Sequence, residues 1–129
     1  MYTPQVIDHY ERPRNVGVIT DADGTGIVGS IDAGETIQLT IAVSDERISD
    51  ARFKAFGCPT VIAAGSVVTE WIKGRRIDEV RRMTVRQIED ALGGLPPEKR
   101  RSATLAEKAL KTAIDDWMSR NPIHPRKGG

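Results

Sequence analysis

The chain has 129 residues, of which 39% are hydrophobic and 29% charged, a balance typical of a single soluble globular domain. Its 19 basic and 18 acidic residues leave a formal net charge of +1, which argues against nucleic acid as the main partner. With one cysteine, and no apolar run of signal-peptide or membrane-spanning length, the sequence predicts a cytoplasmic protein without a disulfide or a membrane attachment.

The first elements in chain order are a short helix and a loop. Thr3 and Pro4 are typical of a helix N-cap and a first helical position, and the dipeptide Arg12-Pro13 predicts the end of that helix. Residues 15–26 contain three glycines and many polar side chains. We therefore expect a loop there, followed by a short strand at Ile27-Val28.

Two segments with alternating polarity follow and predict an antiparallel hairpin with one buried face. Apolar and polar residues alternate from Thr36 to Val43 and again from Ile48 to Phe56. The short polar segment 44–47 between them is typical of a turn.

From Pro59 onwards the apolar residues recur with the period of a helix. The sequence predicts a long helix over residues 59–74 and a short one over residues 76–82. Residues 84–87 form a capping-box pattern, which predicts a further helix that ends near Gly93-Gly94.

The last helix is predicted from a second capping-box pattern, Thr104 to Glu107, and its end from Asn121-Pro122. Strands therefore come early in the chain and helices late. That order predicts an α+β fold in which helices pack on one face of a small antiparallel sheet. We expect a single domain over residues 1–121 and a flexible tail over residues 122–129.

Several motifs resemble, in the same order, those of the IscU/NifU-N family of iron–sulfur cluster assembly scaffold proteins. The resemblance extends from Val6 to Trp117 without a large gap. It implies a compact α+β fold with a three-stranded sheet against helices. The segments that carry it are Val6–Gly17, Asp50–Cys58, Val68–Gly74, Leu95–Lys99 and Leu105–Glu107.

The resemblance also implies a role and partners. Members of the family receive sulfur from a cysteine desulfurase and iron from a donor, build a [2Fe–2S] cluster, and pass it to acceptors with the help of an Hsp70-type chaperone. They supply thiolates rather than acid–base groups. Because this sequence also offers no Cys–His or Ser–His–Asp set, we expect a scaffold-like protein and not an enzyme.

Most of the ligand positions that the resemblance implies carry other residues in this chain. The family's site uses three cysteines, an aspartate and a histidine. Ala33 occupies the place of the first cysteine and Glu35 that of the aspartate, whereas Cys58 matches the second cysteine. Arg101 and Ser102 occupy the places of the His-Cys pair, and the fixed charge of Arg101 would repel a cation. The expected remainder of a metal site is Cys58 with Glu35.

Clusters and zinc require several soft donors, so we expect no cofactor stably bound to the monomer. Iron, zinc or a labile [2Fe–2S] cluster could still be shared between two copies of the chain, or with a paralogue that has all the ligands. Cys58 stands at a predicted helix start, where a thiolate is favoured, so it could carry a persulfide; the alternative is an inert buried side chain. A further alternative is a cluster-free regulatory adaptor that binds a desulfurase or an acceptor.

A motif before the last helix concerns a second partner. The segment Leu95-Pro96-Pro97-Glu98-Lys99 resembles the family's chaperone-recognition motif, Leu-Pro-Pro-Val-Lys. The resemblance assigns partner binding to Leu95, Pro96, Pro97 and Lys99. Glu98 in place of valine is expected to weaken chaperone binding, and the alternative is a stiff loop that positions the last helix.

The chain has two histidines, His9 and His124, and neither matches a ligand position of the family. His9 falls in the predicted N-terminal helix and His124 in the predicted tail. We expect both to be ordinary surface or helix residues.

Overall fold

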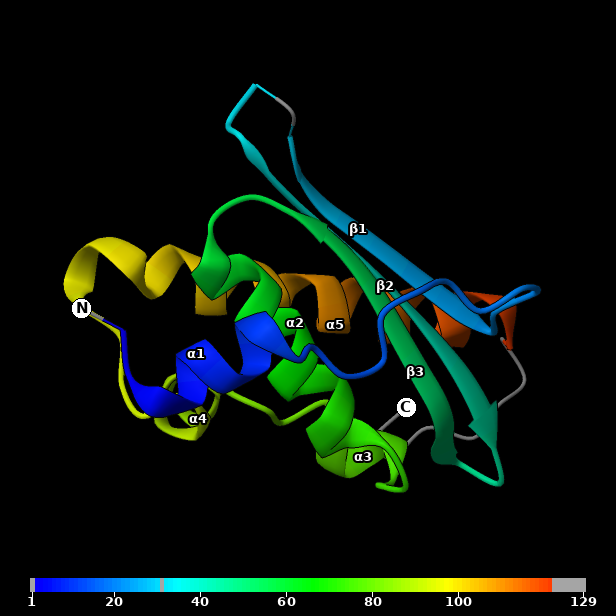
Figure 1. Ribbon diagram of the computed structural model, residues 1–129. Coiled ribbons are helices and arrows are strands. Elements are labelled where there is room, and N and C mark those ends of the chain that lie inside the picture. Colours follow the sequence, from blue (N-terminus) through cyan, green and yellow to red (C-terminus); the bar gives the residue numbers. More distant parts are fainter. Residues whose placement is uncertain (1, 31, 122–129) are drawn as a thin grey trace.

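The computed structural model describes residues 2–30 and 32–121 and confirms the α+β fold predicted from the sequence (Figure 1). An antiparallel sheet in the order β1-β2-β3 carries helices α2 and α5 on one face, and α1 packs against α2. None of the described helices is long and apolar enough to cross a membrane. The elements are α1 (Pro4–Glu11), β1 (Gly24–Ser30), β2 (Glu35–Ser44), β3 (Arg47–Phe56), α2 (Pro59–Ile72), α3 (Ile77–Val80), α4 (Val85–Ala91), the 3₁₀ turn η1 (Pro97–Lys99) and α5 (Arg100–Arg120).

The sheet buries one face because apolar side chains alternate along β2. Ile37, Leu39 and Ile41 are fully buried on the side of the helices, whereas Thr36 and Gln38 on the other side are half-buried. Both β1 and β3 pair with β2 in antiparallel register. The hairpin predicted from alternating polarity is confirmed.

The first strand begins earlier than the sequence predicted, because two glycines assigned to the loop belong to β1. Gly24 and Gly26 lie against the backbone of α5, where a Cβ on either would collide with the carbonyl oxygen of Ala113 or Ala109, respectively. A strand glycine of this kind permits close approach of another backbone. The loop prediction over residues 15–26 was therefore wrong at its C-terminal end.

The helix ends follow the capping signals, with one exception. The Thr3 side chain caps α1 by accepting from the Val6 N–H, and the predicted capping box of α4 is present. The second predicted box was wrong, since α5 begins at Arg100. Thr104 lies inside this helix and its hydroxyl donates to the carbonyl oxygen of Arg100, 3.4 Å away. The turn η1 runs directly into α5, so no separate cap is needed at Thr104.

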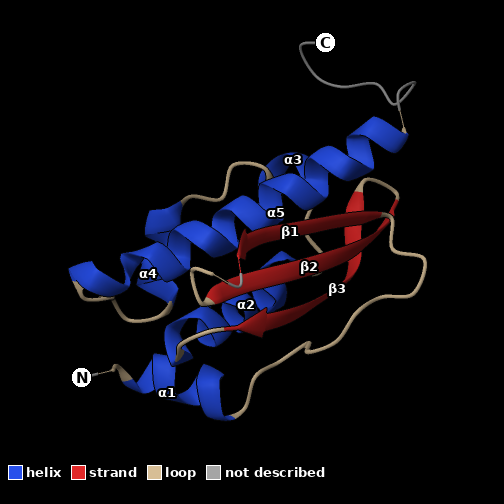
Figure 2. Ribbon diagram, turned by 90° about the horizontal axis from the view of Figure 1, so that it is seen from above, coloured by secondary structure: helices blue, strands red, loops and turns tan. Residues whose placement is uncertain are grey.

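Residues 14–19, which we call the strap, lead from α1 along the outer edge of β3 (Figure 2). The Gly17 N–H donates to the Phe53 carbonyl over 2.8 Å, and the Phe53 N–H donates to the Asn15 carbonyl over 2.9 Å. Part of the predicted loop is thus bonded to the sheet like a short parallel strand.

The predicted tail, residues 122–129, lies outside the described residues, and so does His124. The division into a domain over residues 1–121 and a flexible tail stays a prediction.

Candidate functional site

Cys58 lies where β3 gives way to α2, as the sequence predicted. It is the N-cap residue of α2, with extended backbone angles, and Pro59 follows at the first helical position. Gly57, just before it, has φ +145°, which is accessible to glycine but not to other residues without strain. A Cβ at Gly57 would also approach Glu35 Cγ to 3.2 Å. The Phe56-Gly57-Cys58 sequence therefore turns the chain and brings Glu35 close to the thiol.

Two buried hydroxyls accompany the thiol. Thr60 Oγ1 lies 3.0 Å and Ser102 Oγ 3.9 Å from Cys58 Sγ, and the two hydroxyl oxygens are 2.7 Å apart. Thr60 is 0% and Ser102 1% exposed, whereas Cys58 is half-buried. Since Ser102 lies in the first turn of α5, the N-terminal ends of α2 and α5 meet at the thiol (Figure 1).

An ion pair lies beside these hydroxyls. Arg101 Nε is 3.2 Å from Glu35 Oε1. The Cys58 thiol donates to the other carboxylate oxygen, Glu35 Oε2, over 3.7 Å. The Glu35 side chain is 17% exposed, against 63% for Arg101. Oε1 of Glu35 accepts no well-aligned hydrogen bond within the described part of the chain, so the nearby guanidinium balances its charge without fully satisfying it.

The surroundings of Cys58 lower its pKa below the ordinary value for a thiol. Burial alone would raise the pKa, but hydrogen bonds from the Thr60 hydroxyl, the Val61 backbone N–H and the Ser102 hydroxyl together outweigh it. This direction agrees with the expectation that a helix start favours a thiolate.

The described residues do not assemble a conventional metal centre. Ala33 lies exposed in the turn between β1 and β2, and Arg101 binds the carboxylate of Glu35. In residues 2–30 and 32–121, no group of three or more His, Cys, Asp or Glu side chains is placed to hold a metal ion. One thiol and one ion-paired carboxylate do not fit an iron–sulfur cluster or a structural zinc held by a single chain.

The segment from Leu95 to Lys99 joins α4 to α5 and ends next to the site. Leu95 packs partly against the core, while Pro97 and Glu98 are exposed. Its last residues form η1, two positions before Arg101. The proposed chaperone motif thus lies on the surface beside the Cys58 cluster, and its binding role stays a prediction.

Sequence reasoning missed one residue of the site and did not foresee the burial of a residue elsewhere. Thr60 was not singled out, although a hydroxyl in the first helical turn after an N-cap cysteine is well placed to reach the sulfur. His9 was expected to be an ordinary surface or helix residue. It does lie on α1, but it is 9% exposed and contacts the buried Ser66 of α2. His9 is thus a helix residue, as expected, but a single sequence does not reveal its burial between two helices.

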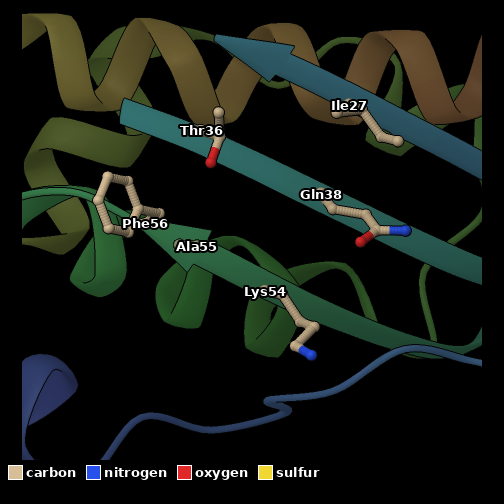
Figure 3. Close-up of a pocket in the computed structure, with 6 residues that line it drawn as sticks. All are labelled: Ile27, Thr36, Gln38, Lys54, Ala55 and Phe56. Atoms are coloured by element: carbon tan, nitrogen blue, oxygen red, sulfur yellow. The ribbon is translucent and has the colours of Figure 1, made fainter. Parts of the chain in front are cut away.

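A shallow hollow of about 370 Å³ lies on the open face of the sheet (Figure 3). Ile27 of β1 and Phe56 of β3 stand on either side of Thr36 and Gln38 of β2. Ile27 is 62% and Phe56 60% exposed. Phe56 precedes Cys58 by two residues in the chain, but none of the residues that line the hollow belongs to the Cys58 cluster.

Comparison with known proteins places these features in a family context. Residues 1–123 match the family described as NifU-like N-terminal domain. The chain is 45% identical over 121 residues to iron–sulfur cluster assembly scaffold protein IscU 1 of Archaeoglobus fulgidus, covering 94% of this chain and 79% of that protein. It is 46% identical over 123 residues to iron–sulfur cluster assembly scaffold protein IscU of Escherichia coli, covering 92% and 95%.

The fold is also similar to solved structures. The crystal structure of a hypothetical protein matches with a TM-score of 0.69 at 25% identity, and the match covers 86% of this chain and 94% of the other.

Proposed function

The chain belongs to the family of NifU-like N-terminal domains, and from that membership we propose that it works in iron–sulfur cluster assembly as a scaffold-like protein with a reduced ligand set. One observation carries the proposal. Cys58, the only thiol of the chain, is hydrogen-bonded at the pole where β2, α2 and α5 meet. In this proposal Cys58 handles the cargo, and Glu35 is the one other residue there that could contact iron.

The donor set favours sulfur over an assembled cluster as the cargo of a single chain. In the transfer step, the Cys58 thiolate attacks the outer sulfur of a persulfide on the donor. The donor's sulfur–sulfur bond breaks, its cysteine leaves as a thiolate, and Cys58 keeps the added sulfur. The hydroxyls of Thr60 and Ser102 lie within 3.0 and 3.9 Å of the sulfur, where they can donate to an anion.

Iron or a [2Fe–2S] cluster would need donors from outside the chain. Cluster iron takes thiolates, commonly four per cluster, and one chain contributes one. We propose that any such cargo is bound weakly, between two copies or with a paralogue that has the full ligand set. A cysteine desulfurase is the proposed sulfur donor, and an Hsp70-type chaperone the proposed partner of Leu95, Pro96, Pro97 and Lys99.

A second candidate function, a cluster-free adaptor, is supported by the ion pair between Glu35 and Arg101. The pair joins two of the family's ligand places, at the start of β2 and of α5, without any metal. A pole closed in this way could present its surface to a desulfurase or an acceptor while carrying no cargo.

Intact-protein mass measurement after incubation with a cysteine desulfurase and cysteine separates the two candidates. For the carrier, we expect one sulfur atom to be added to the wild-type chain and none to Cys58→Ala. An unmodified wild-type chain would refute sulfur carriage. Recovery of the desulfurase in equal amounts by wild type and Cys58→Ala in a pull-down would then favour the adaptor.

A further inference from the structure

Arg101 lies at the candidate site, yet the proposed sulfur transfer does not use it. Its side chain is 63% exposed, and its Nε lies 3.2 Å from Glu35 Oε1. That oxygen accepts no well-aligned hydrogen bond among the described residues, so the ion pair leaves the guanidinium able to turn. The preceding Arg100, in contrast, donates a 2.6 Å hydrogen bond to the buried carboxylate of Glu89. Of the two arginines, Arg101 is therefore the one that can take a second anion.

One carboxylate connects Arg101 to the thiol. Arg101 contacts Oε1 of Glu35, and the Cys58 thiol donates to Oε2 over 3.7 Å. A guanidinium has five N–H donors in a rigid fork, so Nε can stay on Glu35 while a terminal nitrogen reaches another acceptor. Arg101 also precedes Ser102, whose hydroxyl is 3.9 Å from Cys58 Sγ. A turn of the exposed side chain can thus bring the guanidinium to an atom bonded to Sγ.

The buried side of Cys58 has no room for a further atom. Thr60 and Ser102 lie there, 0% and 1% exposed, with their hydroxyl oxygens 2.7 Å apart. A sulfur atom added to the half-buried Cys58 must therefore lie on the solvent side, about 2 Å beyond Sγ. The more exposed side chains of Glu35 and Arg101 border that side.

Addition of sulfur changes the charge at this place. When the Cys58 thiolate has attacked the outer sulfur of the donor, the new sulfur–sulfur bond replaces the donor's, and the donor's cysteine leaves as a thiolate. The persulfide formed on Cys58 is a stronger acid than a thiol, so it gives its proton to water and becomes an anion. It then repels the nearby carboxylate of Glu35. A guanidinium that contacts both anions offsets this repulsion.

We propose that Arg101 binds the outer sulfur of a persulfide on Cys58 while its Nε stays on Glu35, and that it thereby selects an anionic sulfur as the cargo of this site. The inference rests on the proposed sulfur transfer and adds to it the group that holds the product. The same fixed charge repels a metal cation. In the empty site Arg101 contacts one anion, and in the loaded site it contacts two, so it stabilises the loaded form more.

Exchange of sulfur with a small donor measures this preference without a desulfurase. The full chain is equilibrated at about pH 7.5 with fresh glutathione persulfide and glutathione at a fixed ratio, and intact-protein mass gives the loaded fraction. Each added sulfur is assigned to Cys58, the only cysteine. We expect Arg101→Gln to lower the exchange constant by about fivefold, the size of a solvent-exposed ion pair. Arg101→Lys keeps the charge and should stay within about twofold of wild type.

A control and a salt series separate this effect from a structural one. Arg86→Gln is the matched control, because Arg86 is exposed and pairs with Asp90 on its own helix, α4. Its exchange constant should equal that of wild type. The difference between wild type and Arg101→Gln should shrink at about 1 M salt, where the screening length falls to about 3 Å. Equal constants at low salt, or a difference that salt does not change, would overturn the proposal.

Glu35→Gln decides whether Arg101 acts on the sulfur or only on the carboxylate. In this background the charge of Glu35 is gone, but the persulfide still needs a cation. We expect Arg101→Gln to lower the exchange constant there as well, by about threefold or more. Loss of the effect in the Glu35→Gln background would mean that Arg101 only neutralises the carboxylate, and direct binding of the sulfur would be refuted.

The outcomes distinguish this inference from the proposed function. A wild-type chain that takes up sulfur neither from glutathione persulfide nor from a desulfurase would refute sulfur carriage, and the role of Arg101 with it. Equal loading of wild type and Arg101→Gln would refute the role of Arg101 alone. If glutathione persulfide loads the chain and a desulfurase does not, the proposed donor is wrong, while the exchange constants still decide the role of Arg101.

Discussion

Helix α2 contacts two polar clusters that differ in composition and in exposure. At its N-terminal end, Cys58 with Thr60 and Ser102 forms a half-exposed cluster around one reactive atom. Further along, Ser66 binds His9 and Arg14 in a cluster that holds a segment of chain in place. The first is arranged around a thiol, and the second around an imidazole.

The comparison shows how a polar cluster can be held together by its own side chains. At the Cys58 end, Arg101 pairs with Glu35, and Ser102 bonds with Thr60. These bonds join β2, α2 and α5. A buried polar cluster is stable only if its groups satisfy one another.

The largest expected effect comes from restoring the ligands at the Cys58 end. The triple variant Ala33→Cys, Arg101→His, Ser102→Cys would provide three thiols and an imidazole with Cys58, enough for a tetrahedral site. We expect about one zinc ion per chain by elemental analysis after chelator-free purification, against none for wild type. Cys58→Ala in the same background is the control and should lose most of the metal. A metal-free triple variant would show that the backbone no longer presents the site.

A smaller effect is expected from removing one hydroxyl of the same cluster. Thr60→Val removes the strongest hydrogen bond that lowers the pKa of Cys58, so the pKa should rise. It also leaves the Ser102 hydroxyl with one partner fewer, at a cost of about 1–3 kcal/mol of unfolding free energy. Alkylation rates of Cys58 measured against pH, with thermal unfolding, test both effects. Thr104→Val, at a half-buried position of α5, serves as a matched control. An unshifted alkylation profile in Thr60→Val would contradict the assignment.

The smallest effect is expected from the ion pair. Arg101 is 63% exposed, so solvent screens its attraction to Glu35, and Arg101→Ala should cost less than about 1 kcal/mol of unfolding free energy. Urea denaturation measures the change. A much larger loss would indicate that the pair is the main tie between β2 and α5 at this pole.

Much of the fold could be predicted from local patterns, because those patterns act over a few residues. The alternation in β2 and the caps at Thr3 and Thr84 all appear as predicted. The failures at Gly24 and Thr104 share a cause. In each, a local signal was overridden by another element: the α5 backbone, distant in sequence, for Gly24, and the immediately preceding turn η1 for Thr104.

The candidate site, too, has features that could be predicted from the sequence and features that could not. Resemblance singled out Cys58, Glu35, Arg101 and Ser102, and each of the four lies within hydrogen-bonding or ion-pair distance of another of them. A single sequence does not show how side chains are oriented. It therefore could not predict that Arg101 binds Glu35 or that Thr60 joins the cluster.

The contact of Gly24 and Gly26 with α5 bears on how such a protein can diverge. These glycines contact the middle of the helix, at Ala109 and Ala113, about two to three turns from the end that carries Arg101 and Ser102. A helix fixed at its middle keeps its position whatever residues its first turn presents. Residues at the N-terminal end of α5 can therefore be substituted during evolution without moving the helix. The site can diverge in this way while the fold is kept.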